Sequence, residues 1–417
     1  MAVYVVDGGK RLSGEVKIQG SKNSALPILA ATLLCKGECV LFNCPRLSDV
    51  DASLSILRYI GCKARREDST LIVDTGSVER FEIPPELMHR MRSSIIFLGA
   101  MIARFGRARM SFPGGCELGP RPIDLHLSAL REMGAEINEE HGELDCVVND
   151  TLRGASLSLP IPSVGATENI MIAAATARGT TVISNAAREP EIVDLADFLN
   201  ACGAKIHGAG ESTVVIDGVR DLKPASHAII PDRIVAATLM AAAAATGSNI
   251  HFTGVIPAHL EAVIPVFRDA GCEIALSGEG MRLSAPYRLR SPKLIRTMPY
   301  PGFPTDAQAP VMSMAAVADG MTVFVENMFL SRYSHVSELC RLGADIRVEG
   351  KVAVVDGVKR LLSAKVRAHD LRGAAALVVA ALCARGQSEI SGIEYLERGY
   401  EDFELVLSSL GADVKRI

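Results

Sequence analysis

The sequence lacks the features that would place the chain in a membrane or on nucleic acid. Its formal net charge is −4, which argues against a general nucleic-acid surface. Apolar runs such as 236–245 are too short and too rich in alanine to span a bilayer, so no transmembrane helix is expected. Residues Met1–Asp7 lack the basic start, long apolar centre and cleavage site of a signal peptide, and they predict a first strand instead.

The ten cysteines lack paired spacing. Several, including Cys35 and Cys383, lie in apolar helical stretches, which is typical of reduced thiols rather than of a disulfide framework or a zinc site. No histidine or cysteine cluster has metal-ligand spacing, so the sequence indicates no metal. No Gly-x-Gly-x-x-Gly follows a predicted strand, which disfavours a Rossmann-type dehydrogenase. We therefore expect a cytoplasmic protein that needs no cofactor.

What the sequence does contain is a repeat with a period of roughly 70 residues. In each copy an apolar helix ends at a glycine that suits the left-handed position closing a helix, and a short strand follows. An alanine-rich helix lies upstream, and a strand lies between the two helices, which gives a β-α-β-α-β-β unit. The six closing glycines are Gly61, Gly134, Gly203, Gly271, Gly343 and Gly411.

Six such units most simply form two pseudo-threefold domains, an α/β (α+β) fold in which the alanine-rich helices lie inside and the sheets outside. We expect one domain over residues 22–230 and the other over residues 1–21 plus 231–417, with the N-terminal strand paired into the second. A ligand would then bind between the domains. A six-unit solenoid is the alternative, but solenoid repeats are typically shorter than these units.

The segment Pro113–Pro122 places a cysteine and an arginine where the chain can form neither helix nor strand, because it contains three prolines and three glycines. Its glycines allow positive φ, so Cys116 would lie on a mobile loop, with Arg121 nearby to favour a thiolate or to bind an anion. This composition is typical of a lid that carries chemistry. A lone cysteine more often packs as a small core residue, but the loop composition opposes that interpretation.

Unusual polar residues begin the first helix of every unit. Helix N-termini carry free N–H groups and positive dipole, so they bind phosphate or carboxylate, and a neighbouring lysine or arginine adds charge-assisted bonds. Any one of these segments alone is better interpreted as an ordinary cap, but recurrence in six units favours a site for a phosphorylated substrate. The segments are Gly20–Ser24, His89–Ser94, Pro162–Asn169, Pro231–Arg233, Gly302–Asp306 and His369–Arg372.

Seven segments together match one family over the whole length of the chain. They are Gly20–Ala25, Pro113–His126, Ser163–Asn169, Ala186–Asp194, Pro301–Gln308, Asp370–Arg372 and Arg398–Tyr400. On these residues the chain resembles the UDP-N-acetylglucosamine enolpyruvyltransferases. The resemblance implies transfer of the enolpyruvyl group of phosphoenolpyruvate to the 3′-hydroxyl of the UDP-sugar, with release of phosphate, as the first committed step of peptidoglycan synthesis.

The resemblance also implies roles for individual residues. Cys116 matches the family's loop acid, which can also hold phosphoenolpyruvate as a covalent adduct, and Asp306 matches the proposed base. Lys22 and Arg398 complete the implied catalytic set. The implied phosphoenolpyruvate ligands are Lys22, Asn23, Arg92, Arg121, Arg332, Arg372 and Arg398. The implied UDP-sugar ligands are Asn23, Arg92, Arg121, Pro122, Ile123, Asp124, Leu125, Ser163, Val164, Gly165, Thr305, Asp306 and Met328.

Three positions depart from the family's pattern. Leu330 and Val235 stand where a glutamate is common, and Ile161 stands where some members have a lysine near the diphosphate. Leu330 and Val235 belong to the second domain, near the expected sugar end of the site. These two departures therefore bear on the identity or the affinity of the acceptor.

Two other functions stay open. The sister transferase that acts on shikimate 3-phosphate lacks the cysteine loop and has a different lysine motif, so Cys116 together with Lys22 and Asn23 argues against it. A catalytically weak copy could bind a UDP-sugar or a regulatory protein, with Leu330 as its only sequence support. The expected partners are phosphoenolpyruvate and UDP-N-acetylglucosamine, with no nucleic acid and no membrane insertion.

Overall fold

The computed structural model describes residues 2–114, 123–278 and 280–417, and these form two compact units. Unit 1 contains residues 2–19 together with the described residues of 231–417, and unit 2 contains the described residues of 20–230. The chain therefore passes between the units after Gln19 and again after Ile230. The first passage lies two residues before the boundary expected from the sequence.

Unit 2 carries three four-stranded sheets within its described residues, in the orders β14-β3-β5-β4, β6-β7-β9-β8 and β10-β11-β13-β12. In each sheet the first two strands are parallel and the remaining neighbours are antiparallel. The strands are β3 (Glu38–Phe42), β4 (Lys63–Glu67), β5 (Thr70–Asp74), β6 (Glu82–Ile83), β7 (Arg107–Ser111), β8 (Glu136–Glu140), β9 (Glu143–Val147), β10 (Ser156–Ser158), β11 (Thr180–Ser184), β12 (Lys205–His207), β13 (Thr213–Asp217) and β14 (Ser226–Ala228).

Unit 1 repeats this plan in the orders β16-β17-β15-β2, β18-β19-β21-β20 and β23-β25-β1-β26, and a short β22-β24 pair is added. As predicted, the N-terminal strand joins this unit, because β1 pairs with both β25 and β26. The strands are β1 (Val3–Asp7), β2 (Ser13–Lys17), β15 (Asn249–Thr253), β16 (Glu273–Ser277), β17 (Gly280–Ser284), β18 (Leu294–Arg296), β19 (Met321–Val325), β20 (Asp345–Glu349), β21 (Val352–Asp356), β22 (Leu361–Leu362), β23 (Lys365–Arg367), β24 (Ala384–Arg385), β25 (Gln387–Ser391) and β26 (Asp413–Arg416).

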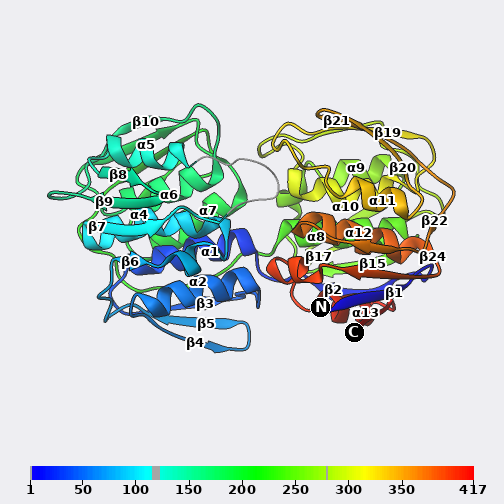
Figure 1. Cartoon of the computed structure of the whole chain (residues 1–417), viewed down its shortest axis with the longest axis horizontal. Coiled ribbons are helices and arrows are strands. Elements are labelled where there is room, and N and C mark those ends of the chain that lie inside the picture. Colours follow the sequence, from blue (N-terminus) through cyan, green and yellow to red (C-terminus); the bar gives the residue numbers. More distant parts are fainter. Residues whose placement is uncertain (1, 115–122, 279) are drawn as a thin grey trace. The chain divides into compact units, whose positions relative to one another are not determined.

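The alanine-rich helices form the core of each unit, as the sequence predicts. Their small side chains allow neighbouring helices to pack closely, and most of their residues are buried. In unit 1, α10 packs against α8 and α12, and in unit 2, α4 and α6 pack against each other and against α1 (Figure 1). These helices are α1 (Lys22–Ala31), α4 (Phe97–Phe105), α6 (Val164–Ala174), α8 (Arg233–Ala245), α10 (Thr305–Ala315) and α12 (Leu371–Cys383).

The second helix of each repeat ends at the predicted glycine, and all six glycines have φ between 91° and 112°. The predicted mixed α/β repeat is therefore confirmed. These helices are α2 (Ser48–Tyr59), α5 (Asp124–Glu132), α7 (Pro190–Ala201), α9 (Ile264–Asp269), α11 (Val336–Arg341) and α13 (Phe403–Ser409). The remaining short helices are α3 (Pro85–Met88), η1 (Thr32–Leu34), η2 (Arg92–Ile96), η3 (Pro257–Leu260) and η4 (Ile393–Arg398).

The helices of the described residues are also short. Among them, none combines the length and the apolar character that crossing a bilayer requires.

Candidate functional site

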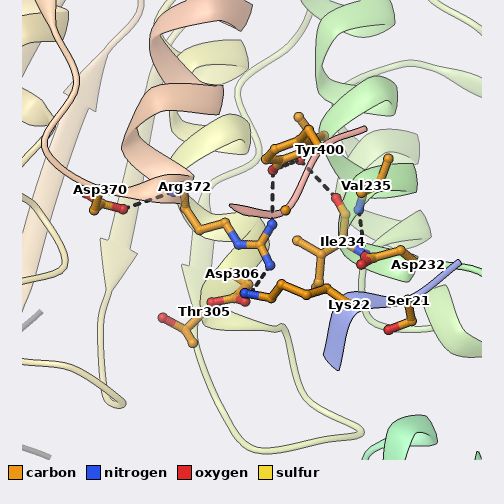
Figure 2. Close-up of polar contacts among 12 residues, drawn as sticks. Ser21, Lys22, Asp232, Ile234, Val235, Thr305, Asp306, Asp370, Arg372 and Tyr400 are labelled. Carbon is orange, nitrogen blue, oxygen red and sulfur yellow. Dashed lines mark hydrogen bonds and ion pairs between the residues drawn. The ribbon is translucent and has the colours of Figure 1, made fainter. Parts of the chain in front are cut away.

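In unit 1 the carboxylate of Asp306 is held by two buried arginines, Arg332 and Arg372. Figure 2 shows Arg372 beside Asp306. Asp306 lies in the first turn of α10; its Oδ1 is 2.7 Å from Nη2 of Arg332, and its Oδ2 is 2.9 Å from Nη2 of Arg372. The arginine side chains are only 2% and 3% exposed, whereas that of Asp306 is 28% exposed. Charge-assisted bonds on both oxygens fix the carboxylate.

Arg332 is fixed by the main chain. Its Nε and Nη2 both donate to the carbonyl oxygen of Thr305, at 3.2 and 2.9 Å. The hydroxyl of Thr305 donates to Glu326, and the other oxygen of Glu326 accepts from the backbone N–H groups of Met328 and Phe329. The start of α10 and the turn that carries Met328 are thereby joined.

Arg372 lies at the start of α12, where Asp370 caps the helix by accepting from the backbone N–H groups of Arg372 and Gly373, each at 3.0 Å. Burial by itself lowers the pKa of the Arg372 guanidinium, but the charges of Asp306 and Asp232, together with the hydrogen bond to Tyr400, outweigh it, and the pKa is raised. Arg372 is therefore a permanent cation. Arg398 ends η4, two residues before Tyr400, whose hydroxyl contacts Arg372.

In unit 2, Lys22 begins α1 and lies beside Asp49, with its Nζ 3.4 Å from Oδ2 of that residue. Ser21 caps the helix by accepting from the backbone N–H of Ser24. Both members of the Lys22–Asp49 pair are largely buried. Asn23, the next residue, is half-buried at the same helix start, so unit 2 presents a cation and an amide at one helix N-terminus.

A second group in unit 2 joins α5 to α6 through His126 and Asn169. The amide oxygen of Asn169 accepts from the backbone N–H of Gly99 at 2.8 Å, and its nitrogen donates to the carbonyl of Ile95 at 3.1 Å. The same nitrogen lies 3.0 Å from Nδ1 of His126, which must therefore accept. Burial, and then the charge of Arg92, lowers the pKa of His126 to about 4, so the imidazole is neutral at pH 7. Because Nδ1 accepts, the single ring proton is assigned to Nε2.

The N-terminus of α6 lies against this histidine. Ser163 caps the helix by accepting from the backbone N–H of Ala166. A Cβ atom at Gly165 would lie 3.2 Å from Cε1 of His126, so glycine lets the helix start and the imidazole approach closely. Ile123 directly precedes α5, and Asp124 and Leu125 form its first turn. Two of the predicted segments of unit 2, Ile123–Leu125 and Ser163–Gly165, thus lie at the starts of two helices that pack against each other.

Comparisons with known proteins identify the family of the chain. The family model for EPSP synthase (3-phosphoshikimate 1-carboxyvinyltransferase) matches residues 6–407. UDP-N-acetylglucosamine 1-carboxyvinyltransferase 2 of Caldanaerobacter subterraneus subsp. tengcongensis is 49% identical over 417 residues, covering 100% of both chains. The enzyme numbered 1 of Carboxydothermus hydrogenoformans is also 49% identical, over 100% of this chain and 99% of its own. The chain belongs to the enolpyruvyl (carboxyvinyl) transferase family.

Solved structures of enolpyruvyl transferases share the fold. The enolpyruvyl transferase NikO from Streptomyces tendae has a TM-score of 0.90 at 26% identity, covering 100% of this chain and 98% of that one. An EPSP synthase from Acinetobacter baumannii has a TM-score of 0.77 at 19% identity, over 100% of this chain and 99% of its own. The resemblance inferred from the sequence motifs is therefore confirmed at the level of the family.

Part of the transferase site expected from the sequence lies outside the described residues. This part comprises Cys116, Arg121 and Pro122, and the predictions for them stay predictions. Of the departures from the family's pattern, Leu330 is 73% exposed, while Val235 is buried in the first turn of α8 and donates its backbone N–H to Asp232. Ile161 is exposed shortly before α6.

Sequence reasoning placed His126, Asn169 and Tyr400 in the segments that carry the resemblance but gave them no individual role, and it did not name Thr238. Thr238 carried a signal, because it is a polar residue inside a long apolar run of α8, and Asn169 carried one as part of the polar run Thr167–Asn169 at a buried helix start. Their partners, however, come from helices and loops far away in the sequence.

Proposed function

We propose that this enolpyruvyl transferase moves the enolpyruvyl group of phosphoenolpyruvate to the 3′-hydroxyl of UDP-N-acetylglucosamine and releases phosphate. The observation that carries the proposal is the full-length match, at 49% identity, to enzymes named UDP-N-acetylglucosamine 1-carboxyvinyltransferase. The product would then be used in the cytoplasm for peptidoglycan synthesis.

Asp306 has the properties of the base in this reaction. Its carboxylate is partly exposed, yet both oxygens are oriented by buried cations. In the addition step it accepts the proton of the sugar hydroxyl while that oxygen bonds to C2 of phosphoenolpyruvate, and Cys116 donates a proton to the methylene carbon. Elimination then removes a proton from the new methyl group and expels phosphate, which restores the carbon–carbon double bond.

The anionic groups of the substrates need several cations. In this proposal unit 1 supplies Arg332, Arg372 and Arg398, and unit 2 supplies Lys22 at the start of α1. Arg121 would add to this set from the Cys116 loop. Because Arg332 and Arg372 are held by protein groups, the carbonyl oxygen of Thr305 and the carboxylate of Asp306, little reorganisation is required when charge develops on the reacting group.

The nucleotide would be bound by unit 2. The diphosphate would lie at the start of α6, formed by Ser163, Val164 and Gly165. The backbone N–H of Ser163 donates to the carbonyl oxygen of Ile161, so the N–H groups of Val164 and Gly165 are the proposed donors to the diphosphate. The other proposed ligands of the UDP-sugar are Asn23, Arg92, Arg121, Pro122, Ile123, Asp124, Leu125, Thr305, Asp306 and Met328.

Phosphate release with different acceptors tests the proposal. Purified protein is incubated with phosphoenolpyruvate and either UDP-N-acetylglucosamine, shikimate 3-phosphate or no acceptor, and inorganic phosphate is measured. We expect release only with the UDP-sugar, and the exposed Leu330 and the buried Val235 would then be compatible with that acceptor. Release with shikimate 3-phosphate alone, or no release at all, would contradict the proposal.

A further inference from the structure

Two buried side chains of unit 1 that the proposed mechanism does not use form a chain of hydrogen bonds that ends at Arg372. Tyr400 is 2% exposed and Thr238, in α8, is fully buried. The hydroxyl of Tyr400 contacts Arg372 (Figure 2) and lies 3.2 Å from its Nη1. The same hydroxyl lies 2.9 Å from Oγ1 of Thr238. Arg372 is thus held at both ends of its guanidinium group, by Asp306 on Nη2 and by Tyr400 on Nη1.

The direction of each hydrogen bond in this chain can be assigned. Thr238 has one hydroxyl proton, and it donates that proton to the carbonyl oxygen of Ile234 at 2.9 Å. Its oxygen must therefore accept from Tyr400. Arginine only donates, so the oxygen of Tyr400 accepts from Arg372. Burial raises the pKa of Tyr400, which keeps the phenol protonated as this assignment requires.

The main chain around Tyr400 is fixed as well. The side chain of Gln19 accepts from the backbone N–H of Glu401 at 2.8 Å and donates to the carbonyl oxygen of Gly399 at 3.3 Å. The ring of Phe403 packs on the ring of Tyr400 with centroids 4.8 Å apart. The Tyr400 hydroxyl is therefore held in place from its backbone, its ring and its oxygen.

The two arginines on Asp306 thus have different anchors. Arg332 is held by the backbone carbonyl of Thr305, which no side-chain substitution removes directly. Arg372 is held on its Nη1 side by the hydroxyl of Tyr400. Loss of that hydroxyl would let the guanidinium rotate about its long side chain, and the Oδ2 side of the carboxylate would lose its fixed partner.

We propose that Tyr400, supported by Thr238, is a positioning residue that fixes Arg372 and, through it, the carboxylate of Asp306. This inference rests on the proposed function, in which Asp306 is the base. It assigns a role in turnover to two side chains that are not among the proposed ligands of either substrate.

The test compares Tyr400→Phe, which keeps the ring packing, with the wild-type enzyme. Removing a hydrogen bond to a charged group should lower kcat by roughly tenfold or more, with the KM for UDP-N-acetylglucosamine unchanged within about twofold. Thr238→Val should lower kcat by a smaller factor, and Thr238→Ser should retain the wild-type kcat. The double variant Tyr400→Phe/Thr238→Val should be no slower than Tyr400→Phe alone, because both changes act through one chain of bonds.

The matched control is Tyr4→Phe. Tyr4 is another buried tyrosine of unit 1, and it donates its hydroxyl to Glu404, away from Asp306. This variant should keep the wild-type kcat, and thermal melting should place both tyrosine variants at comparable stability. If Tyr400→Phe does not fold, the pair Thr238→Val and Thr238→Ser carries the test, and equal kcat for the two would overturn the inference.

The remaining outcomes separate this inference from the function on which it rests. Wild-type kcat in Tyr400→Phe, in an enzyme that turns over the UDP-sugar, would overturn the positioning role and leave the proposed function standing. A rise in the KM for UDP-N-acetylglucosamine with kcat unchanged would also overturn the positioning role. Absence of turnover in the wild-type enzyme would instead overturn the proposed function.

Discussion

Replacing Gly99 by alanine should destabilise unit 2, although alanine is ordinarily the better helix residue. Gly99 lies inside α4 where that helix crosses α6. A Cβ atom there would be 2.3 Å from the amide oxygen and 2.6 Å from the backbone oxygen of Asn169, whereas ordinary contacts begin near 3.4 Å. The helices would have to separate, and the bond from the Gly99 N–H to Asn169 would be strained or lost.

The size of the effect follows from three contributions. Overpacking costs about 1–3 kcal/mol, and leaving a buried hydrogen-bonding group unpaired costs about 1–3 kcal/mol. The better helix propensity of alanine returns about 1 kcal/mol. A net loss of about 3 kcal/mol, in a domain of some 200 residues, corresponds to a melting temperature roughly 6–12 °C lower.

Thermal unfolding followed by circular dichroism or calorimetry measures this directly. Ala103→Gly, in the same helix, is the control, and it should cost about 1 kcal/mol from helix propensity. The sign decides the question, because propensity alone predicts that Gly99→Ala stabilises the protein. An unchanged or higher melting temperature for Gly99→Ala would refute the close-packing argument.

Three further predictions concern the site. Asp306→Asn should lower kcat at least a hundredfold in the phosphate-release assay, because an amide cannot serve as the base; near-normal turnover would contradict the proposed role. Asn169→Asp should raise the pKa of His126 from about 4, because a carboxylate replaces the neutral amide beside Nδ1; an NMR titration of the imidazole that stays near 4 would contradict the assignment. Cys116→Ser should abolish or greatly reduce turnover while calorimetry still detects UDP-sugar binding, and full activity would remove Cys116 from the mechanism.

The pH dependence of stability follows from His126 as well. Its pKa is about 4 in the folded protein, below the ordinary value of 6.5, so the unfolded chain binds the proton more tightly. The contribution of His126 to the free energy of unfolding of unit 2 should therefore be complete above about pH 6.5. It should be lost as the pH falls from there toward 4. Replacing His126 by glutamine should flatten this part of the stability profile, and an unchanged slope would show that other groups cause it.

The repeat could be predicted from sequence because its signals are local. A glycine such as Gly203 marks the end of the helix that directly precedes it. The small and apolar residues of the helix 371–383 predict that it is buried along its whole length. The pairing of strands from opposite ends of a unit is harder to predict from the sequence. Strand β14 pairs with β3 across more than 180 residues, and its three residues, Ser226–Ala228, carry no distinctive pattern.

Some residues of the candidate site can likewise be recognised from the sequence, and others cannot. Lys22, Asp306 and Arg372 stand at helix starts, where unusual charged residues can be recognised from the sequence. The residues that hold these side chains in place cannot be recognised in this way. Tyr400, which follows η4, acquires its role only because the fold places its hydroxyl between Arg372 and Thr238 of α8. Buried hydrogen bonds between distant segments depend on tertiary packing, which a single sequence does not display.

The most direct test of the proposed function is the structure of the reaction product. Phosphoenolpyruvate labelled with carbon-13 at C2 is incubated with the protein and UDP-N-acetylglucosamine, and the product is examined by NMR. The proposed function predicts that the labelled carbon becomes bonded through oxygen to C3′ of the sugar, with a carbon–proton correlation to H3′ and one phosphate released per product. Label recovered only as pyruvate or as unchanged phosphoenolpyruvate, with no link to the sugar, would contradict it.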